Sequence, residues 1–430
     1  MDRIFFIKGL YVKMLKATHQ SPWLICLSAA LFFFFAFLQL NLLNSMSTEL
    51  LSSFSITEIS FGELSASYFL GLGLFFIPAG LLLDRFSTRR LILISMLIEI
   101  MSVILFALSP NYQIAIIARF ISGCVHAIAF LSCIRLTSRW LTKHMGFAIG
   151  VMITIGLCGG IVAQMPMVKL VNSIGWRESV GLLAGIGIII LVLQWIFIVD
   201  HPNELSIENE KIRKTLFHVV KNKQNWLCAT YTALLDLPVI ILGATWGNLF
   251  LTQEHGITQS QAAFVLSMIY IGTIISSSFI GWLSDKLKRR KLVMIIGGIF
   301  ALFIVMPIAF GNIFTVSTLA ILFFLLGFII SAQSISYPTI SESNPFQYTG
   351  IALGFASSII MGSAIVFQPL FGWLIEQHWQ ITIFNTTMNN YRIAFLIIPV
   401  GFIFSILCTI FIKETYCVNY CETITDKHPS

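Results

Sequence analysis

Long apolar stretches alternate with short polar ones along almost the whole chain. A helix that spans a bilayer needs about 20 mostly apolar residues, and most of these stretches reach that length. The pattern predicts twelve transmembrane helices, over residues 22–44, 62–84, 91–109, 112–135, 146–169, 179–199, 226–251, 260–283, 291–312, 315–337, 349–374 and 391–412. The expected fold class is therefore an all-α integral membrane protein.

The composition agrees with this expectation. Hydrophobic residues make up 57% of the chain and charged residues only 10%, with a mean hydropathy of +0.89. A soluble globular protein carries about 25% charged residues, so a soluble fold could not bury this much apolar surface. We expect the chain to form one bundle of helices in lipid rather than several soluble domains.

The basic residues are distributed unevenly among the predicted loops. The net charge of +7 could indicate a nucleic-acid partner. With a cytoplasmic N-terminus, however, 22 of the 26 Lys and Arg residues fall on the cytoplasmic side, against Lys169, Arg177 and Arg392 outside and Arg119 within a span. This positive-inside bias sets the orientation of membrane proteins. We predict that both termini are cytoplasmic and that no nucleic acid binds.

A charged motif occurs twice, each time directly after the second span of one half. The first copy, GLLLDRFSTRR, begins at Gly80, and the second, GWLSDKLKRRK, begins 201 positions later at Gly281. Trp23 and Trp226, which open the first and seventh spans, are separated by nearly the same offset. A constant offset marks a structural repeat, and six spans per half in one orientation indicate parallel repeats.

The repeat divides the chain into four predicted parts. These are an N-terminal six-helix half over 1–199, a cytoplasmic linker over 200–225, a C-terminal six-helix half over 226–412 and a cytoplasmic tail over 413–430. In the linker, Leu205, Ile212, Leu216 and Val220 fall near helical spacing among charged residues. We expect a short amphipathic helix there, lying at the inner interface as a tether between the halves.

Together, the spans, the repeat, the linker and the doubled loop motif resemble the major facilitator superfamily over nearly the whole chain. Residues Arg119 to Gly123 are similar to the arginine motif of that family's fourth span. Two features depart from the family pattern: Ser87 and Lys288 replace the usual later glycine of the loop motif, and the fifth span lacks the adjacent Gly-Pro pair of the family's antiporters. The resemblance implies two halves that rock around a central site.

Three short sequence segments are similar to segments of the phagosomal nutrient transporters of intracellular bacteria, which are amino-acid permeases of the same superfamily. They are AALFFF at 29–34, AGLLLDRFSTR at 79–89 and LSCIRL at 131–136. This resemblance implies transport of an amino acid or similar zwitterion. We expect a proton-coupled transporter that acts as a monomer in a bacterial inner membrane and needs no cofactor. The alternative solute is a siderophore or drug carried by the same fold.

The doubled loop motif is expected to act as a gate. Gly80 and Gly281 would let helices approach closely at the inner face. Asp84 precedes the third span, where its carboxylate can meet the positive helix end or pair with Arg89 or Arg135, latching the outward-facing state. The alternative is that these charges only set topology, although acids contribute little to it. The predicted gating residues are Gly80, Asp84, Arg85, Arg89, Arg135, Gly281, Asp285 and Arg290.

Ionisable residues inside spans are candidates for function because each costs at least about 2.5–3.5 kcal/mol at the helix centre. Asp236 lies near the middle of the seventh span, beside the helix-bending Pro238. The family resemblance implies that the first, fourth, seventh and tenth spans line the cavity. We therefore predict that Asp236 binds the solute or a proton, the alternative being a structural pairing with a neighbouring helix.

Glu99 in the third span and His126 in the fourth are expected at similar depths, roughly 12–13 Å from the inner end at a rise of about 1.5 Å per residue. They could form a carboxylate–imidazole pair that carries a proton, or a purely structural hydrogen bond. Arg119 could hold a solute carboxylate with two hydrogen bonds. Alternatively, it neutralises Glu99 or Asp236.

Neutral polar side chains within the spans need partners or water. A cavity that offers amides, one or two acids, one base and aromatic rings suits a small zwitterion, although any single amide could instead join two helices. The predicted solute-binding residues are Gln39, Asn41, Arg119, Asp236, Trp246, Asn248, Gln333 and Gln368.

The sequence lacks the motifs that are typical of other functional classes of membrane protein. The chain has no Walker-type loop for ATP, and neither H-E-x-x-H nor G-x-S-x-G for a membrane enzyme. Cys417 and Cys421 offer too few ligands for a zinc site. A sensor that binds without transporting is the remaining alternative, and a long signalling tail would favour it, whereas the segment after 412 is short. We expect no enzyme activity, no metal and no cofactor.

Overall fold

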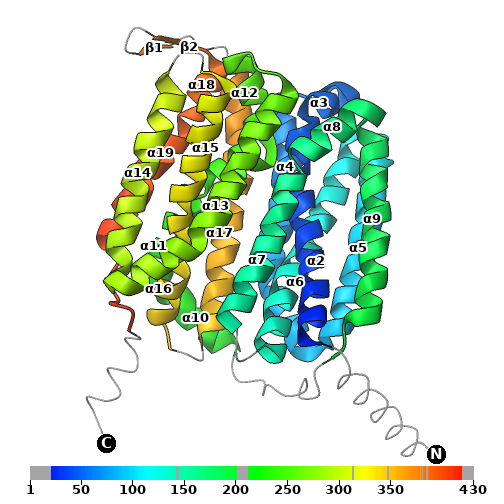
Figure 1. The fold of residues 1–430 in the computed structure, drawn as a ribbon, viewed down its shortest axis with the longest axis vertical. Coiled ribbons are helices and arrows are strands. Elements are labelled where there is room, and N and C mark those ends of the chain that lie inside the picture. The colour runs from blue at the N-terminus through cyan, green and yellow to red at the C-terminus, as the bar shows by residue number, and fades with distance from the viewer. Residues whose placement is uncertain are drawn as a thin grey trace, which may run out of the picture.

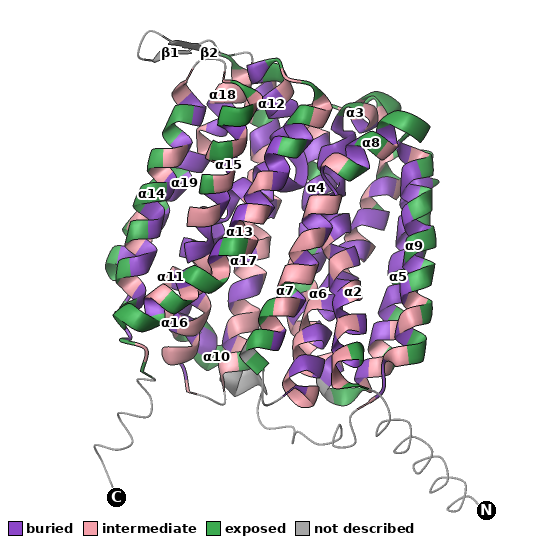
Figure 2. Ribbon diagram, in the orientation of Figure 1, coloured by how far each residue is buried: buried purple, intermediate pink, exposed green. Residues whose placement is uncertain are grey.

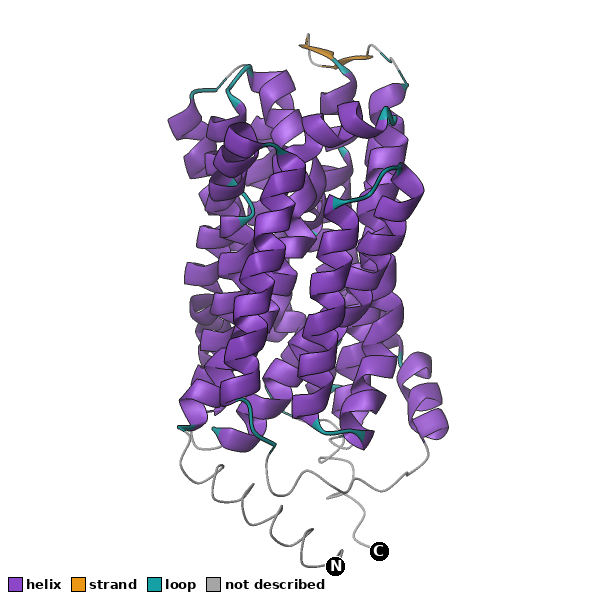
Figure 3. Ribbon diagram, turned by 90° about the vertical axis from the view of Figure 1, so that its right-hand side faces the viewer, coloured by secondary structure: helices purple, strands orange, loops and turns teal. Residues whose placement is uncertain are grey.

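The computed structural model describes residues 21–141, 145–200, 212–311, 314–345, 348–377, 379, 381–383 and 386–418. These residues are almost entirely helical, and their long helices stand side by side in two groups, one from each half of the sequence (Figures 1 and 3). This arrangement confirms the all-α membrane fold that the apolar pattern predicts.

The first group provides six candidate membrane spans. Its segments are α2 (Pro22–Asn41), the 3₁₀-helix η1 (Leu42–Met46), α3 (Ser47–Phe54), α4 (Glu58–Arg85), α5 (Thr88–Ala107), α6 (Tyr112–Trp140), α7 (Met145–Val162), α8 (Met165–Ile174) and α9 (Trp176–Phe197). The second group begins with α10 (Ile212–Lys221), α11 (Lys223–Leu235), the π-helix η3 (Pro238–Trp246), α12 (Gly247–His255), α13 (Gln259–Leu287) and α14 (Arg290–Phe310). It continues with α15 (Val316–Ile330), the 3₁₀-helix η4 (Ser331–Ile335), α16 (Ser336–Glu342), α17 (Thr349–Glu376), α18 (Asn390–Phe395) and α19 (Ile397–Phe411).

The number of spans agrees with the sequence prediction. Eleven helices or joined helices among the described residues are long and apolar enough to cross a bilayer. The pair Lys223–Leu235 and Pro238–His255, bent by 45°, brings the total to twelve. Every predicted apolar stretch coincides with one of these spans.

The two ends of the bundle differ. One end carries exposed basic residues where α4 meets α5 and where α13 meets α14; we call it the basic end, and its exposed cations are Arg85, Arg90, Lys286, Lys288 and Arg289. The opposite end carries the antiparallel strands β1 (Ile381–Ile383) and β2 (Thr386–Met388), and we call it the hairpin end (Figure 1). The sequence analysis did not predict this hairpin.

Large apolar side chains face outward along the length of the bundle, as a lipid environment requires. Exposed positions line α5, α9, α14 and α19 (Figure 2). Ile189 is 62% exposed, Phe303 70% and Phe411 69%. Water would strongly disfavour so much exposed apolar surface, whereas acyl chains accommodate it.

Helix α10 occupies part of the segment interpreted as a linker. It lies at the basic end, beside the start of α17 (Figure 1). The ring of His218 packs on Tyr348 with centroids 5.4 Å apart, and the indole of Trp226 donates to the carbonyl of Val220 at 2.8 Å. The helix is therefore anchored to the second half, while Leu205 of the predicted amphipathic pattern lies outside the described residues.

Candidate functional site

Four spans are interrupted along their length. The first changes to a 3₁₀-helix at Leu42, the seventh to a π-helix at Pro238 and the tenth to a 3₁₀-helix at Ser331, while the fifth breaks at Gln164. Such interruptions release backbone groups from the α-helical pattern and often mark functional positions. Pro238 explains the break in the seventh span, because proline has no N–H to donate.

Asp236 lies at the break in the seventh span, where it ends α11. Its carboxylate is 8% exposed and accepts a hydrogen bond of 2.7 Å from the side-chain amide of Gln333, which belongs to η4 of the tenth span. Tyr270 and Tyr337 lie within electrostatic range of the carboxylate. No ion pair joins Asp236 to any residue that the structure describes. Two predicted residues thus meet here, and Asp236 has a neutral partner.

Asn44 joins the two halves between this site and the hairpin end. Its side-chain NH₂ donates to Gln164 at 2.8 Å and to the carbonyl of Gly243 at 3.2 Å. Its side-chain oxygen accepts from the backbone N–H of Asn248 at 2.9 Å, and its carbonyl accepts from the Asn248 side chain at 3.0 Å. Gln164 also donates to Gly243, at 2.9 Å. We call Asn44, Gln164, Gly243 and Asn248 the amide seal.

The sequence analysis missed Asn44 as a functional residue. It falls at the end of the predicted first span, and nothing in the local sequence separates it from other polar residues at span ends. The breaks in the first, fifth and seventh spans are what bring Asn44, Gln164 and Gly243 together. A weak signal exists: an amide occurs in or next to each of these three apolar stretches.

Other predicted solute-binding residues lie around the amide seal. Asn41 accepts from the Tyr270 hydroxyl at 2.6 Å, across the two halves. Gln368 donates to the carbonyl of Ile240 at 2.5 Å, so it satisfies a backbone group of the π-helix. The Trp246 ring lies between Phe61 and Phe371, with centroid distances of 5.2 and 5.4 Å. Contact of a solute with Asn41, Asn248, Trp246 or Gln368 stays a prediction.

The halves are packed tightly at the hairpin end and diverge toward the basic end. Gly62, Gly73 and Gly80 lie on one face of α4, which faces α17. A Cβ added at Gly62 would lie 2.5 Å from the carbonyl oxygen of Gln368, and one at Gly73 would lie 3.5 Å from that of Ser358. At Gly80, no described atom lies within 4 Å of such a Cβ.

The symmetry-related pair α7 and α13 shows the same divergence. A Cβ at Gly160 would lie 2.8 Å from the ring of Tyr270, whereas one at Gly281, eleven residues beyond Tyr270, meets no described atom within 4 Å. The close approach predicted at Gly80 and Gly281 is therefore absent from this conformation. The physical reason is that their helices have separated at the basic end.

A second polar cluster is buried within the first half. The guanidinium of Arg119 lies 4.4 Å above the ring of Tyr68 and donates to the carbonyl of Gln39 at 2.7 Å. The Tyr68 hydroxyl contacts Nδ1 of His126 at 2.7 Å. Glu99 is fully buried near Arg119, and neither of its oxygens has a hydrogen-bond partner among the described groups.

This cluster changes three expectations. His126 pairs with Tyr68, so the Glu99–His126 hydrogen bond is not formed in this conformation. Arg119 is 2% exposed and contacts α2 and α4 of its own half, near Glu99 and without an ion pair to Asp236 among the described residues, so its role as a counter-charge of Glu99 stays a prediction. Gln39 contributes its backbone carbonyl, while its side-chain nitrogen has no partner among described groups.

The gating charges of the second loop motif form contacts within one half. Arg290 pairs with Asp285 at 2.6 Å and with Glu342 at 2.8 Å. Glu414, which follows the twelfth span, accepts the backbone N–H groups of Arg290 at 2.8 Å and of Lys291 at 3.1 Å. It therefore caps the start of α14, where a carboxylate is favourable. Nearby, burial raises the pKa of the Cys417 thiol, and Arg290 partly offsets that effect.

The first half repeats this cap with Asp200, which follows the sixth span. Asp200 accepts from the backbone N–H of Arg89 at 2.9 Å and from the hydroxyl of Ser87 at 2.6 Å. The sequence analysis assigned this role at the start of α5 to Asp84 instead. The side chain of Asp84 lies outside the described residues, so its pairing with Arg89 or Arg135 stays a prediction. Arg85 is exposed at the end of α4.

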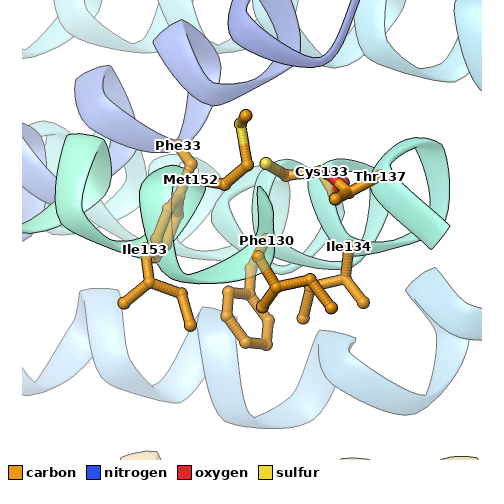
Figure 4. A pocket seen from close by; sticks show the side chains of 8 residues that line it. Phe33, Phe130, Cys133, Ile134, Thr137, Met152 and Ile153 are labelled. Atoms are coloured by element: carbon orange, nitrogen blue, oxygen red, sulfur yellow. The ribbon is translucent and has the colours of Figure 1, made fainter. Parts of the chain in front are cut away.

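A small apolar cavity lies between α2, α6 and α7 (Figure 4). Its volume is about 10 Å³, room for roughly one water molecule. The residues lining it are Phe33, Phe130, Cys133, Ile134, Thr137, Ile149, Met152 and Ile153. It is too small and too apolar for a polar solute. The described residues contain no group of three or more His, Cys, Asp or Glu side chains that could hold a metal ion.

The family model described as "Major Facilitator Superfamily" matches residues 29–239 and 228–416. The chain is 22% identical over 326 residues to the probable sulfoacetate transporter SauU of Cupriavidus necator, covering 70% of this chain and 75% of that protein. It is 24% identical over 370 residues to the membrane sensor protein UhpC of Salmonella typhimurium, covering 78% and 81%.

The fold is similar to solved structures. A point mutant of the nucleoside transporter NupG superimposes with a TM-score of 0.73 at 15% sequence identity, covering 90% of this chain and 99% of that one. At such low identity, the likeness concerns the fold.

Proposed function

Since the chain belongs to the Major Facilitator Superfamily, we propose that it is a proton-coupled secondary transporter of an amino acid or similar small zwitterion. The two halves alternate in exposing a central site to either side of the membrane. Asp236 and Gln333 hold the ammonium group of the solute, and Asp236 carries the coupling proton.

The observation that carries this proposal is the pairing of Asp236 with a neutral amide. A buried carboxylate that lacks a cation is unfavourable and attracts a positive group. An ammonium group or a proton can supply that charge, and one carboxylate cannot bind both fully. Competition for Asp236 would therefore couple the solute to the proton gradient.

The position of Arg119 supports a zwitterion over a simple anion. A small anion needs a reachable cation, and Arg119, the base that the sequence places inside a span, is covered by Tyr68 and already donates to Gln39. The carboxylate of a zwitterion can instead be held by neutral donors of the interrupted spans, as backbone N–H groups hold anions elsewhere. The indole N–H of Trp246, which has no hydrogen-bond partner among the described groups, is one such donor.

We further propose that the basic end faces the cytoplasm of a bacterium, because Lys and Arg are retained on that side. The conformation would then be inward-facing, with the amide seal closed toward the outside. Both termini would be cytoplasmic, and the membrane would be the inner one. A single bundle with its own central site requires no second copy, so the transporter is proposed to act as a monomer.

Two other functions have a specific observation in their favour. SauU is named for sulfoacetate, an organic anion, so a transported organic anion is the second candidate solute. UhpC is named a membrane sensor, so a protein that binds without transporting is the other. The polar pair at Asp236 favours the zwitterion over both, since a carboxylate repels an anion and a titrating group suits coupled movement.

The deciding experiment is uptake into proteoliposomes. Labelled amino acids and organic anions are supplied with and without a proton gradient, to wild type, to Asp236→Asn and to Glu178→Gln, which removes an exposed carboxylate at the hairpin end. We expect gradient-driven accumulation of at least one amino acid in wild type and Glu178→Gln, and its loss in Asp236→Asn. Gradient-driven uptake by Asp236→Asn, or uptake of organic anions alone, would refute the proposal.

A further inference from the structure

The outer surface of the first half carries a groove between α5 and α9 close to the basic end. It has a volume of about 390 Å³ and is lined by Leu93, Ile94, Leu97, Leu191, Val192 and Trp195. Ile94 is 56% exposed and Trp195 63% exposed. The groove therefore faces the surrounding lipid and lies apart from the central site.

One cation lies on the same helix face as the groove. Leu93, Ile94 and Leu97 follow Arg90 by three, four and seven residues, the spacing of one face of an α-helix. Arg90 is exposed and forms no ion pair with any other described residue. Its guanidinium thus marks the end of the groove that meets the membrane surface.

Hydrogen bonds join the start of α5 to the end of α9 beside the groove. Arg89 donates its side-chain Nη2 to the carbonyl of Trp195 at 2.8 Å, and its backbone N–H to Asp200 at 2.9 Å. Asp200 also accepts from Ser87. These contacts engage the carboxylate of Asp200 within the protein, and among the described residues none forms an ion pair with Arg90.

In the second half, the base equivalent to Arg90 has a partner within the protein. Lys291, which lies 201 positions after Arg90 in the repeat, donates its Nζ to the carbonyl of Ile410 at 2.8 Å. The base of the second half is thus tied to the end of its own twelfth span. The combination of an apolar groove and an exposed base without an ion pair among the described residues therefore belongs to the first half, and the duplication of the halves does not account for it.

We propose that this groove binds one phospholipid with a net negative headgroup, from the leaflet at the basic end. An acyl chain fills the space between α5 and α9, and the phosphate accepts from the guanidinium of Arg90, which suits phosphate geometry. The amphipathic Trp195 ring lies at the level where tryptophans favour the interface. A zwitterionic lipid fills the groove equally well, but its own cation weakens the attraction to Arg90.

Quenching of tryptophan fluorescence tests this proposal on the purified full-length protein in mixed micelles. Acyl chains carrying bromine quench nearby indoles, and the difference between wild type and Trp195→Phe isolates the contribution of Trp195. Brominated phosphatidylglycerol should quench this contribution at about one-fifth the mole fraction that brominated phosphatidylcholine requires, since one basic residue near a membrane surface contributes about a fivefold preference.

Charge variants separate this site from general attraction. Arg90→Gln should make the two lipids equivalent, and Arg90→Lys should keep most of the preference. Arg289→Gln removes an exposed base from the basic end of the other half and should leave the preference unchanged. Equal quenching by both lipids in wild type, persistence of the preference in Arg90→Gln, or equal losses in Arg90→Gln and Arg289→Gln would each overturn the proposal. Free inorganic phosphate should not compete, and competition by it would show an ion site instead of a lipid site.

Discussion

At the scale of single residues, the central site is defined by a buried carboxylate, Asp236, that has no cationic partner among the described residues. Its carboxylate has an amide partner, Gln333, at 2.7 Å, and none of the ion pairs among described residues includes it. In the first half, by contrast, the buried Glu99 has Arg119 nearby. A base therefore lies near the buried acid of the first half, whereas the buried acid of the second half has only an amide beside it and is suited to binding a positive group.

Replacing Gln333 by Ala should weaken solute binding without unfolding the protein. A hydrogen bond to a charged group contributes about 1.5–3 kcal/mol, so we expect KM for the transported solute to rise about tenfold or more, with the maximal rate within a few-fold of wild type. Initial rates in proteoliposomes measure this. Gln377→Ala, which removes an amide at the hairpin end, is the control and should behave as wild type. An unchanged KM in Gln333→Ala would show that the amide does not orient Asp236.

At the scale of elements, the interrupted helices determine which side is closed. The amide seal links η1 and the fifth-span break of the first half to η3 and α12 of the second. Asn44 is at its centre, with four of these hydrogen bonds. Its removal would leave several backbone and amide groups without partners, each worth about 1–3 kcal/mol when buried.

Asn44→Ala should therefore shift the protein toward opening at the hairpin end. The test uses a background without native cysteines and a single cysteine at Ser45, which is buried beside Asn44 in η1. An impermeant maleimide applied from the hairpin side should label this cysteine at least tenfold faster in Asn44→Ala. Asn172→Ala, an exposed amide on α8, should not change the rate. Equal labelling rates in both variants would mean that the amide seal does not hold the gate.

The two acid caps should stabilise the basic end. Glu414 accepts two backbone N–H groups at the start of α14, and loss of a helix cap costs about 0.5–2 kcal/mol. Glu414→Ala should lower the thermal unfolding temperature of the detergent-solubilised protein by a few degrees and leave KM unchanged. Glu178→Ala, an exposed acid at the hairpin end, serves as the comparison. A lowered transport rate without a stability loss would instead assign Glu414 to the gate.

The sequence predicted the spans and the repeat because both depend on local quantities, the length of apolar runs and a constant offset. It also singled out Asp236 and Gln333, since polar groups in apolar runs are conspicuous. It could not place Asn44, Asp200 or Glu414, because each lies at the end of a run and acquires its partner through the packing of distant helices. Likewise, the Glu99–His126 hydrogen bond expected from their equal depth is absent from this conformation. The hydroxyl of Tyr68, from a third helix, is hydrogen-bonded to Nδ1 of His126 instead.

At the scale of the whole molecule, the spacing between the halves changes along the bundle axis. Glycines at the hairpin end allow α4 and α17 to touch, whereas Gly80 and Gly281 at the basic end face open space. The repeat gives both interfaces the same design. A rigid rocking motion would therefore close the helices at Gly80 and Gly281 when it opens them at Gly62.

A side chain added at either end should consequently trap opposite states. Valine at Gly62 cannot fit, because its Cβ would lie 2.5 Å from the carbonyl oxygen of Gln368 and 2.8 Å from Cα of Pro369. Gly62→Val should keep the hairpin end open. Gly80→Val fits the present conformation and should prevent closure of the basic end. Both variants should lose most transport, for opposite reasons, while Gly181→Val, in open space on α9, should retain it.

Labelling of the Ser45 cysteine from the hairpin side distinguishes the two trapped states. The labelling should be fast in Gly62→Val and slow in Gly80→Val. The same labelling rate in the two variants would rule out a rigid alternation of the halves. In a rigid rocking motion, a side chain that keeps one end open must keep the other end closed, so valines at opposite ends must have opposite effects on labelling.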